Sequence, residues 1–302
     1  MPALQGKAIV ITGAGRGLGL AYALHAAAEG AAVIVNDVDS AAARAAAEQI
    51  TERGGRASWN DHSVREHESA AALIADCVGR YGRLDGLVNN AGLRPEGSAW
   101  AEAPGDVRAA VEVNLLGTLF CGIPAMKVMR EQGHGSIVNA SSRAQRGIPT
   151  SATYAATKGA VASLTYSWAI DMHSSGVRVN AIAPQAGGTG TRRQSEPAGS
   201  SEPSAEQMAP LVTYLLSDRS VAVTGQVIRL GGRRDLLSVG LMTHPRNGPF
   251  LRRADGWTAD TLADAFDTFF GPRLEPVGAG SLAVAYEIIA GSRVTRAQED
   301  AL

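Results

Sequence analysis

The sequence predicts an α/β protein built on one doubly wound sheet of about seven parallel strands. Short runs of β-branched and aliphatic residues alternate along the chain with longer segments of helical periodicity. The short runs are continuously apolar, as expected for strands of a parallel sheet that helices cover on both faces. Strands and helices in alternation form right-handed β-α-β units, which build such a sheet.

The predicted elements follow one another in a regular order. The segments with the length and composition of strands are 8–12, 31–37, 57–60, 84–90, 135–141, 177–183 and 225–231. The helices expected between them cover 18–30, 40–52, 64–81, 105–131, 152–174 and 204–217. Gly30 ends the first helix and Gly54-Gly55 the second, because glycine is a common residue at helix C-termini.

Two regions depart from this alternation. Residues 186–203 are rich in glycine, serine and proline, and we expect a loop there. No strand is expected after Gly232, and the remaining residues contain one predicted helix, 258–270. We therefore predict a single domain over 1–232 that includes the active site, and a C-terminal extension over 233–302 that packs on it.

Composition argues against several classes of protein. The 28 basic and 29 acidic residues give a net charge of −1, whereas nucleic-acid-binding proteins carry a basic excess. The two cysteines, Cys77 and Cys121, and the six scattered histidines form no disulfide framework or metal-ligand pattern. The chain opens without an apolar signal region, and it has no run of about 18 apolar residues. We expect a cytoplasmic protein with no metal, nucleic-acid or membrane partner.

A glycine-rich loop, TGAGRGLG at 12–19, follows the first strand and opens the first helix. Its glycines would let backbone N–H groups approach a pyrophosphate at the helix N-terminus. The loop residues expected to contact a cofactor are Gly13, Gly15, Arg16, Gly17, Leu18 and Gly19. The loop alone is a weak signal, but its place between a strand and a helix is typical of a Rossmann dinucleotide site.

Two charged residues bear on the choice between NAD and NADP. The second strand ends in Asn36-Asp37, and a carboxylate there accepts hydrogen bonds from ribose hydroxyls and repels a 2′-phosphate. Arg16 argues the other way, because a guanidinium can pair with a 2′-phosphate. Asp37 lies where the ribose is expected, so NAD is the expected cofactor and NADP the alternative.

The stretch 141–158 combines serines, a tyrosine and a lysine. Tyr154 and Lys158 are four residues apart on a predicted helix and share one face. A lysine ammonium beside a phenol lowers the tyrosine pKa from about 10, so that the tyrosine can exchange a proton with an alcohol or carbonyl oxygen. Ser141 or Ser142, at the carboxyl end of a strand, could hold that same oxygen.

Taken in order, five motifs resemble those of the short-chain dehydrogenase/reductase family over residues 5–232. The motifs are TGAGRGLG (12–19), NNAG (89–92), VNLLG (113–117), Ser-x12-Tyr-x3-Lys (141–158) and VRVNAIAP (177–184). The resemblance implies a catalytic tetrad of Asn114, a serine, Tyr154 and Lys158. It also implies cofactor contacts from Asp61, His62, Asn90, Ala91, Gly92, Tyr154, Lys158 and Pro184, and from a threonine that is Thr189 or Thr191.

Spacing selects the catalytic serine. The family places it thirteen residues before the tyrosine, and counting back from Tyr154 gives Ser141. The family glycine six residues after the serine also points to Ser141, because Gly147 is six residues beyond it. Ser142 is then a neighbour that caps the following loop.

The resemblance implies an NAD(H)-dependent oxidoreductase that interconverts a secondary alcohol and a ketone, with Tyr154 as acid/base. Homodimers or homotetramers are usual in the family. Patchy similarity to (3R)-hydroxyacyl-CoA dehydrogenase units makes a 3-hydroxyacyl thioester one candidate substrate, beside polyketide-like and other hydroxy or keto compounds. Arg94, Arg143 and Arg146 form either a rim that attracts an anionic substrate or a solvated surface. The alternative functions are a non-redox lyase or epimerase, and an NAD-binding protein without turnover.

Overall fold

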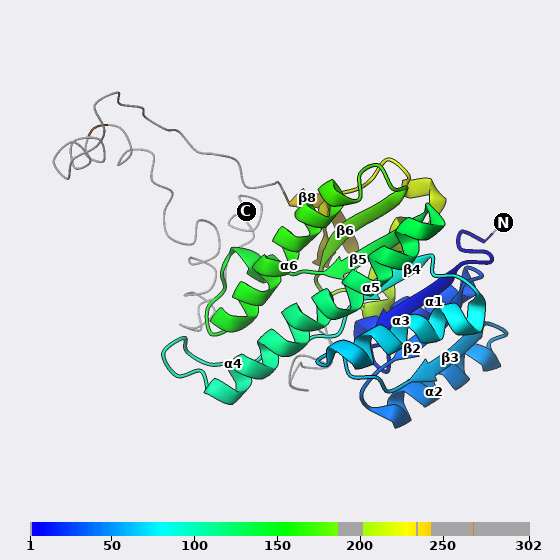
Figure 1. The fold of residues 1–302 in the computed structure, drawn as a ribbon. Helices are drawn as coiled ribbons and strands as arrows, with labels where there is room; N and C mark the ends of the chain where they lie inside the picture. The colour runs from blue at the N-terminus through cyan, green and yellow to red at the C-terminus, as the bar shows by residue number, and fades with distance from the viewer. Residues whose placement is uncertain (1, 187–201, 234, 243–267, 269–302) are drawn as a thin grey trace. The chain divides into compact units, whose positions relative to one another are not determined.

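The structure is a computed structural model that describes residues 2–186, 202–233, 235–242 and 268 (Figure 1). Residues Met1–Met242 form one compact unit, and Thr243–Leu302 are a second. Most of the loop expected at 186–203, and all but one residue of the helix expected at 258–270, lie outside the described residues.

The first unit is built on a sheet of eight strands in the order β3-β2-β1-β4-β5-β6-β7-β8. The strands are β1 Ala8–Thr12, β2 Ala32–Asn36, β3 Arg56–Asn60, β4 Gly86–Asn89, β5 Gly135–Ala140, β6 Val177–Pro184, β7 Val227–Arg233 and β8 Leu236–Met242. Every pairing from β3 to β7 is parallel. This confirms the predicted doubly wound α/β fold with seven parallel strands.

Strand β8 is an addition that the sequence analysis assigned to the C-terminal extension. It runs antiparallel to β7, with Val227 opposite Met242 and Arg233 opposite Leu236. Gly232 has a φ of 122°, a conformation that favours glycine, just before the chain reverses direction. The sheet therefore ends in a hairpin and not at β7.

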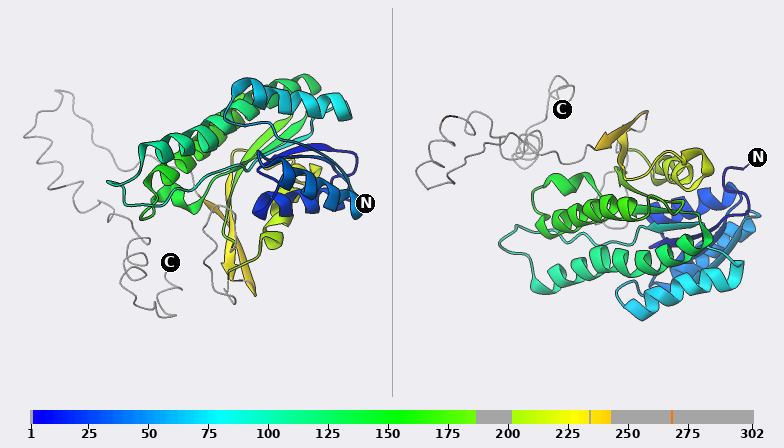
Figure 2. Two further views of the ribbon diagram at one scale, coloured as in Figure 1. Left: turned by 90° about the horizontal axis from the view of Figure 1, so that it is seen from below. Right: turned by 45° about the horizontal axis from the view of Figure 1, so that its top comes forward.

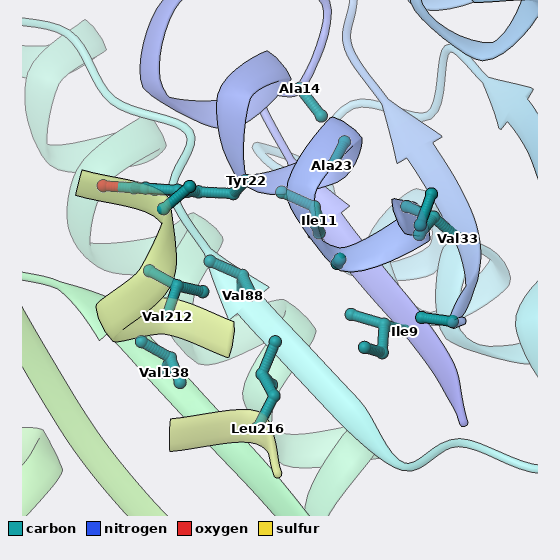
Figure 3. Packing of buried hydrophobic residues seen from close by; sticks show 14 of the residues in the cluster. Ile9, Ile11, Ala14, Tyr22, Ala23, Val33, Val88, Val138, Val212 and Leu216 are labelled. Atoms are coloured by element: carbon teal, nitrogen blue, oxygen red, sulfur yellow. The ribbon is translucent and has the colours of Figure 1, made fainter. Parts of the chain in front are cut away.

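Helices cover both faces of the sheet (Figures 1 and 2). They are α1 Gly17–Ala28, α2 Ser40–Glu52, α3 His67–Tyr81, α4 Pro104–Val111, α5 Gly117–Gln132, α6 Ala152–Asp171 and α7 Ala205–Leu216. Buried residues of α1, α2 and α7 form one core with the sheet, and those of α3, α5 and α6 form another. Figure 3 shows the first core, in which Tyr22 of α1 and Val212 of α7 lie over Val88 and Val138.

Strand β1 shows why the strand sequences are continuously apolar. Ile9 and Ile11 belong to the core under α1 and α7, whereas Ala8 and Val10 belong to the core under α3 and α5. Successive side chains of a strand point to opposite faces, so both sets are buried.

The helix predicted at 105–131 is interrupted. A turn of π-helix, Glu112–Leu116, separates α4 from α5. The run Pro104–Gln132 contains an 18-residue stretch with a mean hydropathy of 1.5, so by length and composition alone the run could cross a membrane. Its residues Cys121, Ala125 and Met129 are buried in the core with α3 and α6, which is the packing of a core helix.

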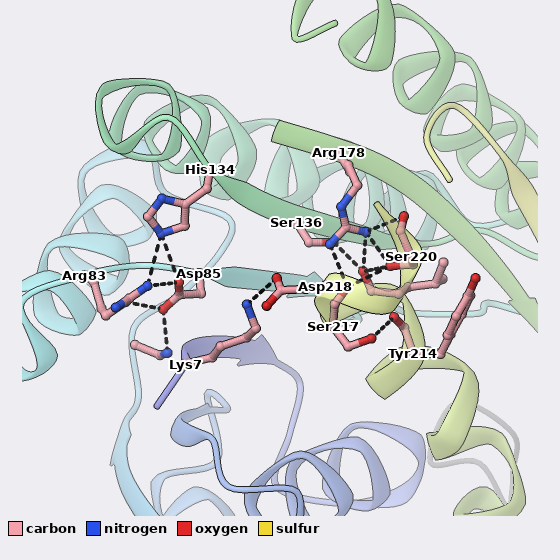
Figure 4. A network of polar contacts seen from close by, with 12 residues as sticks. Lys7, Arg83, Asp85, His134, Ser136, Arg178, Tyr214, Ser217, Asp218 and Ser220 are labelled. Atoms are coloured by element: carbon pink, nitrogen blue, oxygen red, sulfur yellow. Dashed lines mark hydrogen bonds and ion pairs between the residues drawn. The ribbon is translucent and has the colours of Figure 1, made fainter. Parts of the chain in front are cut away.

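A polar network lies where β1, β4 and β5 begin (Figure 4). The buried carboxylate of Asp85 accepts hydrogen bonds from Arg83 and from the Ala8 N–H at 2.9 Å, and His134 Nε2 lies 3.1 Å from the same carboxylate. Burial acts to raise the pKa of Asp85, but the bonds from Arg83 and Ala8 and the charges of Arg83 and Lys7 outweigh it and hold the pKa below its usual value. This network stabilises the amino-end edge of the sheet, opposite the cavity described next.

Candidate active site

A cavity of about 570 Å³ lies at the carboxyl ends of the parallel strands. Its walls come from the loops after β1, β2, β3, β4 and β5, from the end of β6 and from α6. The lining residues are Gly13, Arg16, Leu18, Gly19, Asn36, Asp37, Val38, Ser63, Val64, Arg65, Asn90, Ala91, Gly92, Leu93, Val113, Ala140, Ser141, Tyr154, Lys158 and Pro184. This is the position at which doubly wound sheets bind their ligands.

The glycine-rich loop is tightly folded at one end of the cavity. A Cβ atom on Gly19 would lie 2.1 Å from the Gly13 carbonyl oxygen, so the loop and helix meet this closely only with glycine. The Asn90 side chain donates to the carbonyls of Thr12 at 3.0 Å and Gly13 at 3.1 Å, and so holds the loop. Helix α1 has no side-chain cap, which leaves its first N–H groups available to an anion.

Asp37 and Arg16 line the same cavity but have different partners. The buried Asp37 carboxylate accepts hydrogen bonds from the backbone N–H groups of Gly15 and Asp39, both at 3.1 Å. Arg16 is exposed and lies 3.7 Å from the Asp39 carboxylate. The negative charge of Asp37 is therefore held in place at the end of β2, while part of the Arg16 charge is offset by Asp39.

The residues present fit a dinucleotide. Three features line the cavity continuously. They are a glycine loop that a Cβ atom would obstruct, an uncapped helix N-terminus, and a fixed carboxylate at the end of β2. These residues would hold the pyrophosphate and the adenosine ribose.

Asn114 reaches the site from the turn of π-helix. Its side-chain oxygen accepts from the Leu93 N–H at 2.7 Å, and its amide donates to the Leu93 carbonyl at 2.9 Å and to Thr157 Oγ1 at 3.0 Å. A Cβ atom on Gly92 would lie 3.3 Å from Asn114 Oδ1 and 3.5 Å from Lys158 Nζ. Asn114 thus joins the loop after β4 to α6, beside the lysine.

Lys158 is buried, and its ammonium donates a hydrogen bond of 2.6 Å to the Ala140 carbonyl. Burial lowers the pKa of Lys158 to about 8, because a charged amine is poorly solvated there. The Nζ atom lies 5.7 Å from the centre of the Tyr154 ring, so the predicted Tyr154–Lys158 pair does share one helix face.

The expected effect of the lysine on Tyr154 is not what the structure shows. Burial raises the pKa of Tyr154, and a side-chain hydrogen bond with Ser142 and the positive charge of Arg94 only partly oppose it. The expectation of a tyrosine pKa lowered by Lys158 was therefore wrong, because it took no account of burial.

The two serines lie differently from the prediction, which placed the Ser141 hydroxyl beside the tyrosine. Ser141 Oγ is 2.9 Å from both Gln145 Oε1 and the Lys158 carbonyl, and its single hydrogen serves one of these acceptors. Ser142 Oγ accepts from the Ala144 N–H at 3.1 Å, so its own hydrogen is available to Tyr154. Although Ser141 borders the cavity, Ser142 is the serine in contact with Tyr154.

The remaining predicted residues fall into three groups. Asn90, Ala91, Gly92 and Pro184 line the cavity as expected. Asp61, His62, Gly15 and Gly17 are not among the lining residues, although the Gly15 N–H orients Asp37. Thr189 and Thr191 lie outside the described residues.

Several lining residues were not predicted. Ser63, Val64 and Arg65 follow β3, and Leu93 and Val113 flank the Asn114 contact. A signal was available for the first three, because every loop that follows a parallel strand reaches this edge of the sheet.

The fold and the cavity define a class of protein, the nicotinamide-dependent oxidoreductases built on a Rossmann-type sheet. A family model described as short chain dehydrogenase matches residues 7–199. The chain therefore belongs to the short-chain dehydrogenase family, whose members act on hydroxy and keto groups with a nicotinamide cofactor.

Three relatives illustrate the similarity. The short-chain reductase protein NovJ of Streptomyces niveus is 36% identical over 247 residues, which cover 76% of this chain and 94% of NovJ. The structure of a short chain dehydrogenase from Mycobacterium avium has a TM-score of 0.81 and 30% identity, covering 91% of this chain and 98% of its own. A gluconate 5-dehydrogenase from Burkholderia cenocepacia J2315, solved with NADP and tartrate, has a TM-score of 0.70 and 33% identity, covering 75% of this chain and 94% of its own.

Proposed function

We propose that the protein is an NAD(H)-dependent oxidoreductase that interconverts a secondary alcohol and a ketone. The observation that carries the proposal is that Tyr154 and Lys158 share one wall of the glycine-loop cavity, with Lys158 Nζ 5.7 Å from the centre of the tyrosine ring and Ser142 beside the tyrosine hydroxyl. When bound, the nicotinamide supplies the hydride acceptor or donor. The protein's own residues bind and orient the reactants and move the proton.

Tyr154 is the general acid/base. In the oxidation direction its oxygen takes the hydroxyl proton of the alcohol, and in the reduction direction its hydroxyl returns a proton to the carbonyl oxygen. Ser142, which lies beside Tyr154, would turn its single hydroxyl hydrogen to the substrate oxygen and orient it, and Lys158 provides a buried positive charge beside the ring. Asn114 positions the loop after β4 against α6 and so fixes the wall of the site.

We propose NAD as the preferred cofactor. The fixed carboxylate of Asp37 would repel a 2′-phosphate, and the Asp39 carboxylate offsets the guanidinium that could attract one. The Burkholderia gluconate 5-dehydrogenase was solved with NADP, which keeps NADP as the alternative cofactor. Fluorescence titration with NADH and NADPH tests the preference, and tighter binding of NADPH by the wild-type protein would reverse it.

The substrate is proposed to be a secondary alcohol or ketone, with 3-hydroxyacyl thioesters, polyketide-like compounds and hydroxy acids as candidates. We also propose a cytoplasmic homodimer or homotetramer. The domain that the sequence places at 1–232 would hold the site, and β8 at the start of the extension 233–302 would complete its sheet.

The deciding experiment supplies NAD and a panel of alcohols to the purified protein and follows the absorbance of the reduced cofactor. Turnover that disappears in Tyr154→Phe, with NAD binding retained, supports the proposal. Near-normal turnover in that variant overturns Tyr154 as the base. NAD binding without turnover on any alcohol or ketone favours the binding protein. Release of water or inversion of a centre without cofactor reduction favours the lyase or epimerase.

A further inference from the structure

Arg94 lies directly beside Tyr154. The loop after β4 brings the carbon of its guanidinium within 5.6 Å of the centre of the Tyr154 ring. The Arg94 side chain is 26% exposed, and its Nε atom is 3.4 Å from Ser151 Oγ and 3.7 Å from Glu96 Oε1. It is therefore a partly buried, tethered residue, and not the solvated rim that the sequence left open.

Two cations thus face Tyr154 from different elements, and they respond differently to pH. Lys158 lies at 5.7 Å from the ring centre on α6, and its pKa of about 8 means that it loses its charge as the pH rises through that value. A guanidinium stays protonated throughout the range in which proteins are folded. Above a pH of about 8, Arg94 is the cation that still acts on the tyrosine.

Within the part of the chain that the structure describes, two carboxylates contact Arg94 or the residue next to Tyr154. Glu96 is 51% exposed and pairs with Arg94 at 3.7 Å, so it weakens the field of the guanidinium without cancelling it. Glu102, in the loop after β4, accepts hydrogen bonds from Thr153 at the start of α6. Ser142 is neutral and bonds the tyrosine hydroxyl.

We propose that Arg94 acts through Tyr154, as a second cation that stabilises the ionised tyrosine, lowers the pH at which it ionises, and keeps its charge where Lys158 loses its own. The inference deepens the function proposed above and rests on it, because it assigns a tuning residue to the same acid/base. A cation at this distance favours the phenolate by direct attraction, an effect that the solvent screens only in part because the site is buried.

The test measures the ionisation of Tyr154 itself and needs no turnover. Alkaline absorbance titration of tyrosinate is recorded for the wild type and for Tyr154→Phe, and the difference between the two curves isolates Tyr154 from the other five tyrosines. The same pair of curves is recorded in the Arg94→Met background. Circular dichroism at each pH confirms that the proteins remain folded.

We expect the Tyr154 midpoint to rise by about one pH unit in Arg94→Met, a tenfold weaker ionisation, and by much less in Arg94→Lys. If Arg94→Met does not fold, Arg94→Gln replaces it, because the glutamine can still bond Ser151. The matched control is Arg146→Met, which removes one exposed positive charge from the loop after β5 and should leave the midpoint unchanged.

An unchanged midpoint in the Arg94 variants overturns the inference, and so does an equal shift in Arg146→Met. These outcomes concern the ionisation of Tyr154 and do not depend on turnover. The proposed function fails by a different result, a normal rate of turnover in Tyr154→Phe.

Discussion

The Ser142 hydroxyl forms a hydrogen bond with Tyr154, while the neighbouring Ser141 hydroxyl turns to Gln145 and to the Lys158 carbonyl. Adjacent residues at the end of β5 thus have separate tasks. Under the proposed function, Ser142 would meet the reacting oxygen, whereas Ser141 ties the loop after β5 to α6.

The first prediction concerns these two serines. Ser142→Ala should lower kcat about 100-fold, because the reacting oxygen and Tyr154 lose a hydrogen bond that orients them. Ser141→Ala, the matched control, should lower kcat far less and instead reduce the free energy of unfolding by about 1 kcal/mol, through loss of a buried hydrogen bond. Steady-state kinetics and urea unfolding of both variants provide the check. A larger loss of rate in Ser141→Ala would restore the assignment made from spacing.

The second prediction concerns the buried lysine. Lys158→Met should abolish turnover yet raise the free energy of unfolding at neutral pH by about 1 kcal/mol, because it removes a poorly solvated charge. The lowered pKa of Lys158 means that, between about 8 and its usual value of 10.5, the unfolded chain binds a proton that the folded protein does not. Wild-type stability therefore gains from this group as the pH rises through that window.

Thermal melts at neutral and alkaline pH test the lysine prediction. The melting temperature of Lys158→Met should exceed that of the wild type by about 3 °C at neutral pH, and the difference should shrink as the pH rises. A lower melting temperature for the variant at neutral pH would show that the bond to Ala140 outweighs the desolvation of the charge.

The third prediction concerns the network at the amino ends of the strands. Asp85→Asn should lower the free energy of unfolding by about 2 kcal/mol at neutral pH, because the groups that donate to the buried carboxylate lose a charged acceptor. The lowered pKa of Asp85 gives stability that is present above its unfolded value, near 3.8, and lost as the pH falls through the folded value. Urea unfolding should therefore show the wild-type and variant stabilities converging in acid.

Asp218→Asn is the control for that experiment. Asp218 pairs with Lys7 at 2.8 Å, but its side chain is 87% exposed, so its removal should cost less than about 0.5 kcal/mol. An equal decrease in the free energy of unfolding in the two variants would contradict a special role for burial at Asp85.

The fourth prediction concerns the start of the helix that carries Tyr154. Ser151 makes no side-chain cap, and Glu102 of the loop after β4 accepts instead from the Thr153 N–H at 3.2 Å and from its hydroxyl at 2.5 Å. Glu102→Ala should cost about 1 kcal/mol and speed hydrogen exchange of the first-turn amides, whereas Glu102→Gln keeps an acceptor and most of the protection. Unchanged exchange in the alanine variant would show that Glu102 does not cap α6.

Much of the fold could be predicted because its signals are local. Ile9 and Val10 are both buried on opposite faces of β1, and a strand with two covered faces has a continuously apolar sequence. Strand β8 could not be predicted in this way, since Leu236, Val239 and Leu241 are exposed and the strand depends on pairing with β7.

In the site, too, the features that depend on neighbours in the sequence could be predicted, and those that depend on distant parts of the chain could not. The glycine loop and the Tyr154–Lys158 pair depend on neighbours in the sequence and were predicted with their geometry. The choice between Ser141 and Ser142 depends on how the short helix Arg143–Arg146 turns after β5, which counting residues does not reveal. The pKa of Tyr154 depends on burial, on Ser142 and on Arg94, which reaches it from the loop after β4.

The π-helical turn at Glu112–Leu116 has a consequence for how the chain tolerates length changes. Such a turn accommodates one residue more than an α-helix would place there, and that extra residue carries the Asn114 side chain toward Leu93 and Thr157. Deleting a single residue within it would let α4 and α5 merge into a regular helix with better backbone geometry. The shortened protein would be expected to fold and yet lose the bridge between the loop after β4 and α6, so this irregularity serves the site and not the regularity of the helix.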